Sequence, residues 1–304
     1  MTTGAEEAFW SEWNRVRTED LQSLLAGLGA DSSLFKLEQV RERLDALDGL
    51  DIRFGDLNAQ ELRNDVNARI CRAIRARLEL INTVLYESIR SEIMHGGPRH
   101  TLLQCIQAAG PGETANPIPG LGYDYRDEVL SGVLKLREPS EPRLHPLPEM
   151  VFYQPTPVRH ILRLLAAIEI SEADVFVDLG SGLGHVAILA SMLTGVRSIG
   201  IEVEAAYVAS AQECAQGLRI SRVRFICEDA RAADLSSGTV FYLYSPFTGS
   251  ILADVLERLE KASTSRRIKI CALGPCTRTL AKAPWLEAIA LPDPMQITVF
   301  QRRL

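Results

Sequence analysis

Two acidic residues bracket a cluster of glycines near the middle of the sequence, and this combination is the most suggestive of chemistry. Asp178 begins the run DLGSGLG, and Glu202 ends the later run RSIGIE. Glycines at alternate positions let the backbone turn sharply and approach a ligand closely. An acid at the start of such a turn would repel a pyrophosphate but suits a ligand with a positive charge or an amino-acid group. The pattern therefore predicts a binding site for a small ligand of that kind.

The residues around the glycines are typical of a strand, a turn, a helix and a second strand. Val175 to Val177 is a β-branched and aromatic run of the kind found in buried parallel strands. His185 to Leu193 is apolar and compatible with a helix whose free N–H groups would face the ligand. Arg197 to Ile201 forms the second strand, so Glu202 stands at its end.

The spacing of the glycines distinguishes two kinds of nucleotide site. A dinucleotide-binding turn has the pattern G-x-G-x-x-G, whereas here the third glycine comes one residue early and position 185 is His. The pattern D-x-G-x-G-x-G, with an acid closing the next strand, resembles the cofactor site of class I S-adenosylmethionine (SAM) methyltransferases; a plain strand-to-helix connection is the alternative. The resemblance implies that SAM is the cofactor, that the turn lies beside its methionine part and that Glu202 binds its ribose. The cofactor-binding residues implied in this segment are Asp178, Gly180, Ser181, Gly182, Gly184 and Glu202.

A second resemblance begins upstream, in the segment MVFYQPTP. Thr156 followed by Pro157 is typical of a helix start, with Thr156 as the N-cap of an amphipathic helix over about 158–168. A tyrosine-and-threonine loop, this helix and then DVFVDLGSGLG are similar to the opening of the catalytic domain in the non-SET, seven-strand histone-lysine methyltransferases of the disruptor-of-telomeric-silencing family, over roughly residues 150–205. In that family the loop closes over SAM, which implies a cofactor-binding role for Tyr153 and Thr156.

The remaining chain continues to alternate helices and strands. It predicts an α/β fold, with a doubly wound, mostly parallel, seven-stranded Rossmann-like sheet whose ligand crevice lies at the carboxyl ends of the strands. An acid after the third strand commonly meets the adenine in SAM enzymes, which implies that Asp229 binds the adenine amino group with Ala230 beside the ring. The expected helices are Ala205 to Gln216 and Ile251 to Lys261, and the expected strands are Val223 to Cys227, Thr239 to Tyr244, Ile268 to Leu273, Leu286 to Ala290 and Gln296 to Gln301.

The segment Tyr244-Ser245-Pro246-Phe247 follows the fourth strand and lies where the reacting methyl group is expected. It resembles the (Asn/Asp/Ser)-Pro-Pro-(Tyr/Phe) motif of amino-methylating enzymes, one proline short. The resemblance implies that a side-chain oxygen and a backbone carbonyl accept hydrogens of the target nitrogen while the aromatic ring packs on the substrate. Ser245, Pro246 and Phe247 are therefore the predicted catalytic residues. A strand-ending turn with a packed phenylalanine is the alternative interpretation.

The first half of the chain has a different character. Residues 1–113 are predicted to form a helical N-terminal domain, with helices that include 33–47, 58–94 and 100–109. Residues 114–150 are rich in proline and form the expected connection, and residues 151–304 form the SAM-dependent methyltransferase domain.

Charge and composition exclude several classes of protein. The chain has 304 residues, 46% of them hydrophobic, and a net charge of −6, which argues against binding along a phosphate backbone. No nucleic acid is therefore expected as the primary substrate, and no membrane partner. Acids near the N-terminus do not fit an export signal, and the six scattered cysteines fit a reduced, cytoplasmic protein without a metal site.

The sequence thus predicts a SAM-dependent methyltransferase that methylates an amino group, with a protein lysine as one candidate. Its acidic, helical first half does not match the basic nucleosome-binding parts of the family it resembles, so a histone substrate does not follow. A small-molecule N- or O-methyltransferase is an alternative, in which His160 or His185 would be the nearest base. Another alternative is a non-catalytic protein that binds SAM or a nucleotide. The oligomeric state is left open.

Overall fold

The computed structural model describes residues 27, 34, 36, 39–54, 66–97, 99–107, 122–139 and 149–303. Its chain divides into two compact units, Met1–Ile89 with Thr101–Ala108, and Arg90–His100 with Ala109–Leu304. The helix that the apolar residues from Phe9 to Leu28 predict lies almost wholly outside the described residues, as do residues 114–121 and 140–148 of the proline-rich connection. Within the described ranges, no helix combines the length and the apolar character needed to cross a membrane.

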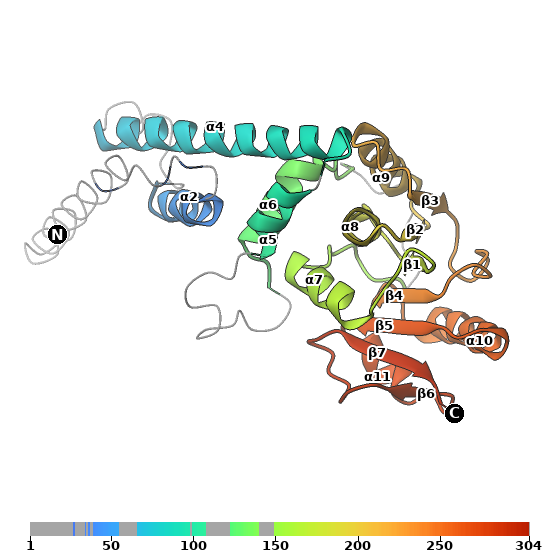
Figure 1. Ribbon diagram of the computed structural model, residues 1–304. Helices are drawn as coiled ribbons and strands as arrows, with labels where there is room; N and C mark the ends of the chain where they lie inside the picture. Colours follow the sequence, from blue (N-terminus) through green and yellow to red (C-terminus); the bar gives the residue numbers. More distant parts are fainter. Residues whose placement is uncertain are drawn as a thin grey trace, which may run out of the picture. The chain divides into compact units, whose positions relative to one another are not determined.

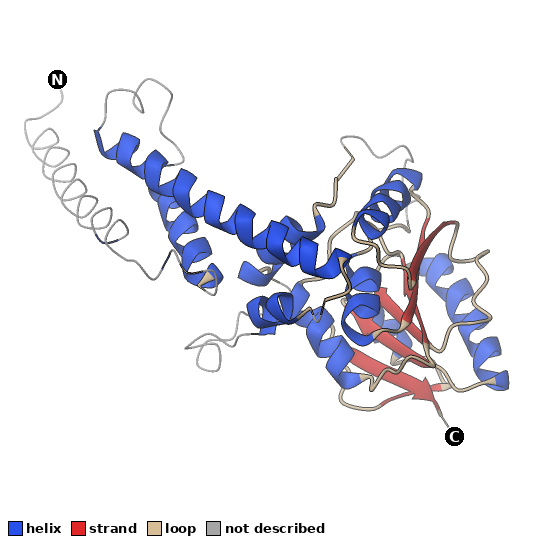
Figure 2. Ribbon diagram, turned by 45° about the horizontal axis from the view of Figure 1, so that its top comes forward, coloured by secondary structure: helices blue, strands red, loops and turns tan. Residues whose placement is uncertain are grey.

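The second unit is built on a seven-stranded sheet with the strand order β3-β2-β1-β4-β5-β7-β6 (Figures 1 and 2). The first five strands are parallel, and β7 runs antiparallel to both β5 and β6. This arrangement confirms the predicted doubly wound sheet and its closing antiparallel pair. The strands are β1 Val175–Leu179, β2 Arg197–Glu202, β3 Val223–Cys227, β4 Val240–Tyr244, β5 Lys269–Leu273, β6 Leu286–Ala288 and β7 Thr298–Arg302.

Helices cover both faces of the sheet, as expected for strands that are apolar along their whole length. On one face, α8 (His185–Thr194) packs on β1 and β2, and α9 (Ala205–Gly217) packs on β2 and β3. On the other, α10 (Gly249–Ser265) contributes to a core cluster with Val177 and Leu179. Because side chains alternate along a strand, Asp178 points away from that cluster, toward the face that α8 covers.

Several element boundaries differ from the sequence-based expectation. Helix α2 (Val40–Phe54) begins later than predicted and continues across Gly49, while α10 extends beyond its predicted bounds at both ends. A short helix, α11 (Cys276–Leu280), was not predicted at all. Helix α7 (Val158–Ala167) is confirmed, but the expected N-cap is wrong: Pro157 occupies the cap position and no side chain caps the helix. The Thr156 hydroxyl bonds to Tyr242 instead.

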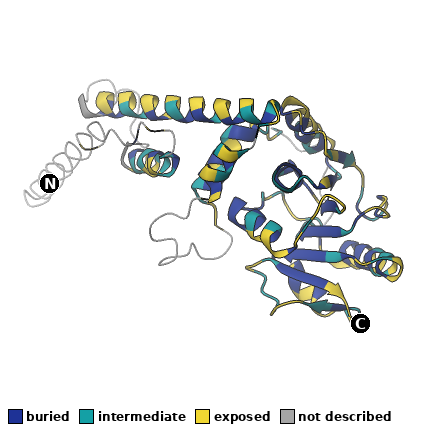
Figure 3. Cartoon of the chain, viewed as in Figure 1, coloured by how far each residue is buried: buried dark blue, intermediate teal, exposed yellow. Residues whose placement is uncertain are grey.

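The first unit contains α2, most of α4 (Val66–Met94) and most of α5 (His100–Gln107). The helix expected over 58–94 is present from Val66 as α4, with Leu78, Leu85 and Ile89 buried and the opposite face of the helix exposed (Figure 3). Arg43 is also fully buried, and its Nε donates to Asn82 Oδ1 at 2.7 Å. That contact joins α2 to α4 through a charge-assisted hydrogen bond.

The second unit has an unusually well-capped helix before the sheet, α6 (Tyr125–Leu134). The Asp124 carboxylate accepts from the backbone N–H groups of the first turn and forms an ion pair with Arg126 at 2.9 Å. Asp127 completes the capping box, and its other oxygen accepts from the Val158 N–H at 2.9 Å, at the start of α7. Two neighbouring acids therefore fix where both α6 and α7 begin.

We predict that Asp124→Ala lowers the free energy of unfolding by about 3 kcal/mol, because it removes both the cap of α6 and the carboxylate that forms an ion pair with the buried Arg126. Urea denaturation of the full chain measures the change. Glu128→Ala is the matched control, since Glu128 lies exposed in the same first turn, and it should change stability by less than about 0.5 kcal/mol. Equal losses in the two variants would contradict the assigned role of Asp124.

Candidate functional site

A cavity of about 370 Å³ lies at the carboxyl ends of β1 to β4, where the strand order reverses. The loop of residues 150–156 forms one wall, and the segments that follow the four strands form the others. Nearly all of the predicted site residues meet here, although Gly182 and Gly184 do not line the cavity. Those that line it are Tyr153, Thr156, Asp178, Gly180, Ser181, Glu202, Asp229, Ala230, Ser245, Pro246 and Phe247.

The glycine turn needs its glycines for two reasons. Gly180 and Gly182 have φ values of +76° and +51°, which side chains rarely tolerate. In addition, a Cβ on Gly180 would lie 2.2 Å from the Pro246 side chain, and one on Gly182 would lie 2.1 Å from the Tyr153 ring. The turn thus provides space for two neighbouring loops, and glycine here serves protein packing as well as backbone conformation.

Glu202 is held in a fixed orientation at the end of β2. Its Oε2 accepts from the Gly182 N–H at 2.9 Å, and its Oε1 accepts from the N–H groups of Val203 and Glu204 at 2.8 and 2.9 Å. Three backbone donors on one carboxylate fix the orientation of the side chain at the edge of the cavity.

Asp178 is the most unusual ionisable group in the cavity. Its side chain is buried, and Oδ2 has no hydrogen-bond partner among the described residues. Burial, with a smaller effect from the nearby Glu202 charge, raises the pKa of Asp178 to about 8. The hydroxyl of Ser181, in the turn itself, is likewise buried and has no partner within the described part of the chain. Both groups are therefore available to a polar or cationic ligand.

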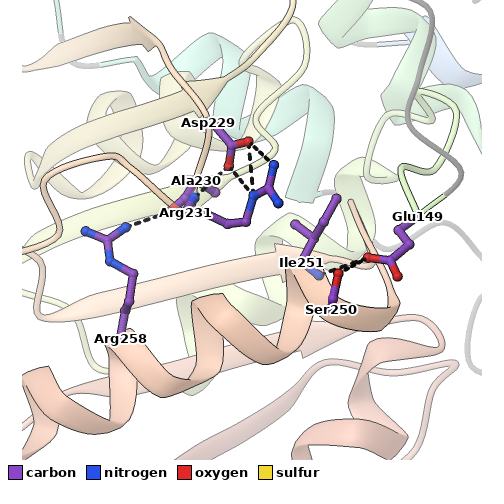
Figure 4. A network of polar contacts seen from close by, with 7 residues as sticks. All are labelled: Glu149, Asp229, Ala230, Arg231, Ser250, Ile251 and Arg258. Atoms are coloured by element: carbon purple, nitrogen blue, oxygen red, sulfur yellow. Dashed lines mark hydrogen bonds and ion pairs between the residues drawn. The ribbon is translucent and has the colours of Figure 1, made fainter.

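The loop of residues 149–156 is attached to the start of α10 and to the segment after β4. The Glu149 carboxylate accepts from Ser250 Oγ at 2.7 Å and from the Ile251 N–H at 3.0 Å, at the start of α10 (Figure 4). The Val151 N–H donates to the Pro246 carbonyl at 3.1 Å, and Met150 forms a β-bridge with Phe247. The loop is therefore fixed at its first residues by both a carboxylate and backbone contacts.

Tyr153 and Thr156 continue this loop, with Tyr153 in contact with α8 and α9 and Thr156 in contact with β4. Tyr153 Oη lies 3.1 Å from His185 Nδ1, and its ring packs against Tyr207 with centroids 5.0 Å apart. Burial lowers the pKa of His185 to about 4, so its imidazole is neutral near pH 7. Thr156 Oγ1 lies 3.0 Å from Tyr242 Oη in a buried contact. Sequence reasoning treated His185 as a helix residue and missed Tyr207, because only the fold brings them beside Tyr153.

The segment after β3 is held by arginines. Arg231 donates to both oxygens of Asp229, with the shortest contact at 2.7 Å, and these hydrogen bonds lower the pKa of Asp229 (Figure 4). Arg258 donates to the Ala230 carbonyl at 2.8 Å. Asp229 and Ala230 are thus fixed in the cavity wall, and the Asp229 carboxylate already has a cationic partner.

The three predicted catalytic residues have mostly internal contacts. Ser245, with φ +43°, donates its hydroxyl to the Leu273 carbonyl at 3.0 Å and accepts from the Cys276 N–H at 2.9 Å. The Pro246 carbonyl accepts from Val151, as described above. Phe247 is buried in the core cluster beneath α10. These are the contacts of a strand-ending turn with a packed phenylalanine, and the role of the three residues in methyl transfer stays a prediction.

The part of the chain that builds the cavity also matches a known family. Residues 150–237, which include the loop, the glycine turn and strands β1 to β3, match the family described as "Histone methylation protein DOT1". The chain is a class I SAM-dependent methyltransferase. Its cofactor is SAM.

The methyltransferase also resembles solved structures. An RNA methyltransferase from Salinibacter ruber in complex with S-adenosyl-L-homocysteine is 28% identical over 49% of this chain and 92% of that chain, with a TM-score of 0.40. A SAM-dependent methyltransferase from Geobacter sulfurreducens is 22% identical over 44% of this chain and 50% of that chain, with a TM-score of 0.33. A mutant of MtNAS in complex with S-adenosylmethionine is 14% identical over 94% of this chain and 97% of that chain, with a TM-score of 0.40. No curated protein matches the sequence.

The raised pKa of Asp178 predicts an unusual pH dependence for the cofactor-free methyltransferase. In the folded chain Asp178 keeps its proton up to about pH 8, whereas in the unfolded chain it loses it above about pH 4. The folded state therefore loses stability from this group as pH rises between these values. Asp178→Asn cannot ionise, so we expect it to be more stable than the wild type by about 2 kcal/mol or more at pH 8, with a gain that vanishes toward pH 4.

Urea denaturation over this pH range measures the difference. Asp174→Asn is a control of opposite sign, because hydrogen bonds from Ser171 and Thr239 outweigh burial and lower the pKa of Asp174. That variant should lose stability at neutral pH and approach the wild type in acid. A wild type as stable as Asp178→Asn at pH 8 would contradict the burial of an unpaired carboxyl group.

Proposed function

We propose that the methyltransferase transfers the methyl group of SAM to an amino nitrogen, and that the predicted cofactor residues hold SAM. The buried and unpartnered Asp178 Oδ2 fits a cationic group beside the glycine turn, and Ser181 Oγ offers a second polar contact. The fixed carboxylate of Glu202 fits the ribose hydroxyls, and Asp229 with Ala230 fits the adenine. Tyr153 and Thr156 then cover the cofactor from the loop side.

One observation supports a nitrogen rather than an oxygen as the acceptor. Among the residues that line the cavity, the carboxylates belong to β1, to the end of β2 and to the segment after β3, whereas the β4 side presents Tyr242 and Tyr244. Burial raises the pKa of both phenols, to about 12 for Tyr244, so they are neutral near pH 7. A hydroxyl acceptor needs a base to take its proton, and a neutral His185 with a pKa of about 4 is a weak one. A neutral amine already has the lone pair that it needs.

The aromatic residues of the cavity would prepare such an amine. When bound, SAM supplies an electrophilic methyl group on a sulfonium; the N–C bond forms as the S–C bond breaks, and S-adenosylhomocysteine leaves. The rings of Tyr153, Tyr207 and Tyr244 exclude water from the acceptor, which lowers the pKa of a buried ammonium and favours the neutral form. The ammonium proton leaves to solvent before the transfer. The same rings stabilise the cationic product through their π faces.

A protein lysine is the acceptor that we favour. Support comes from the family match over residues 150–237, whose description names histone methylation. The chain carries a net charge of −6, which is complementary to a basic protein segment. A small-molecule amine would use the same chemistry and is an outcome of the second test below.

We predict that Glu202→Ala weakens binding of SAM and S-adenosylhomocysteine about 100-fold, because it removes a charged partner of the two ribose hydroxyls. Isothermal titration calorimetry on the full chain measures both constants. Glu213→Ala, on the exposed face of α9, removes the same charge away from the cavity and should leave them unchanged. Equal affinities in wild type and Glu202→Ala would remove Glu202 from the cofactor site.

For the acceptor, we predict that incubation of a cell extract with the enzyme and methyl-labelled SAM places the label on protein lysine. Amino-acid analysis of hydrolysed protein identifies the methylated side chain, and chromatography of the filtrate detects labelled small molecules. The Glu202→Ala variant provides the background. Label in a methyl ester or ether would contradict amine methylation, and label confined to small amines would exclude a protein substrate.

A further inference from the structure

Three buried polar atoms in the cavity wall have no hydrogen-bond partner among the described residues. They are Asp178 Oδ2, Ser181 Oγ and Tyr244 Oη. A buried polar group without a partner costs stability, so each of these atoms indicates a ligand group that completes it. The first two belong to the glycine turn and to the proposed cofactor site. The Tyr244 hydroxyl has no place in that site and needs a separate explanation.

Tyr244 occupies a particular position in the sheet. It is the last residue of β4, one step beyond the register pair Leu179 and Leu243, so it lies across from the glycine turn. Tyr242 pairs in register with Asp178, and Tyr244 lies two residues further along the strand. Side chains two apart share a face, so Tyr244 and Asp178 point to the same side of the sheet. The phenol therefore stands at the point where strand order reverses, beside the turn.

The other polar groups at this end of β4 have partners already. Ser245 Oγ both donates and accepts a hydrogen bond, and the Pro246 carbonyl accepts from Val151. The neighbouring Tyr242 hydroxyl is bonded to Thr156. Among the hydroxyl groups of Tyr242, Tyr244 and Ser245, that of Tyr244 is thus the one without a hydrogen-bond partner within the described chain.

We infer that Tyr244 Oη binds the acceptor nitrogen and orients its lone pair toward the methyl group, a role that rests on the proposed amine methylation. The phenol oxygen accepts an N–H of the neutral amine before transfer and of the methylated ammonium after it. Burial keeps the phenol protonated near pH 7, so the contact is a hydrogen bond to a neutral oxygen. Ser245, which the sequence pattern favours for this task, instead fixes the turn through Leu273 and Cys276.

The test uses two SAM analogues that differ at the reacting centre. Sinefungin carries an amino group where SAM carries its methyl group, and S-adenosylhomocysteine carries nothing there. Calorimetry on the full chain gives the ratio of their dissociation constants. We expect wild type to prefer sinefungin, and Tyr244→Phe to lower that preference about tenfold while its affinity for S-adenosylhomocysteine stays unchanged. Tyr123→Phe removes a hydroxyl that already donates to the Pro155 carbonyl, and it should keep the preference.

Thermal unfolding of the cofactor-free protein provides a second readout. Removing a hydroxyl that has no partner should leave the melting temperature of Tyr244→Phe equal to or above that of wild type. Ser245→Ala should lower it, because the buried Cys276 N–H loses its acceptor. A lower melting temperature for Tyr244→Phe would show that the hydroxyl has a structural partner and would overturn the proposal.

The binding results discriminate further. An equal loss of affinity for both analogues in Tyr244→Phe would place the hydroxyl against the methionine part of the cofactor, and unchanged affinities for both would remove it from the reacting centre; either result overturns the proposal. Absence of any sinefungin preference in wild type would also overturn the proposal. The labelled-methyl assay is independent of these outcomes: a labelled ester overturns amine methylation itself, whereas labelled lysine with an unchanged ratio overturns only the role of Tyr244.

Discussion

A buried carboxyl group that has no counter-charge among the described residues imposes the main constraint on the centre of this methyltransferase. Asp178 ends up buried because β1 is covered on both faces, and its position at the carboxyl end of the strand puts it beside the glycine turn. Ionising such a group without a partner costs several kcal/mol, which is why the folded chain holds its proton. A bound cation would reverse this preference, so at the proposed cofactor site a cationic ligand and the proton would compete for one carboxyl group. The burial that destabilises the ligand-free protein near neutral pH would therefore also strengthen the electrostatic attraction between the Asp178 carboxylate and a positively charged ligand.

The loop of residues 149–156 depends on this centre from the other side. At one end the Glu149 carboxylate accepts a hydrogen bond from Ser250 at the start of α10, and at the other end the Thr156 hydroxyl is bonded to Tyr242. Between them, the Tyr153 ring occupies the space that the missing side chain of Gly182 leaves open. Contacts of this kind connect the covering loop to β1, β4 and α10 at once. The loop therefore forms a wall of the cavity whose position follows from its contacts with the sheet and with α10.

Local sequence patterns were enough to predict most of the strands and helices of the second unit. The strand-turn-helix run from Val175, the early third glycine and the acid at Glu202 all depend on neighbours within one βαβ unit. The fold confirms the strands, and the comparisons with known proteins confirm the cofactor. The element ends were less accurate where tertiary contacts decide them. Thr156 looked like a helix cap, yet Tyr242, far along the chain, takes its hydroxyl. Glu149 gave no signal at all, because its partners on α10 become neighbours only in the folded chain.

The difference between Ser245 and Tyr244 shows what sequence patterns leave out. A motif indicates which residue types tend to occur around a reaction, but it does not say which of their atoms already have partners. Ser245 stands at the motif position, and folding uses its hydroxyl to join β5 to α11. Tyr244, one residue earlier, carries an oxygen that folding leaves without a partner within the described chain. Since native proteins leave few buried polar atoms unpaired, the exceptions that gather around one cavity mark where a ligand must supply the missing partners. On that basis the unpaired atoms form two groups, Asp178 and Ser181 at the glycine turn, where we propose the methyl donor, and Tyr244 at the end of β4, where we propose the acceptor.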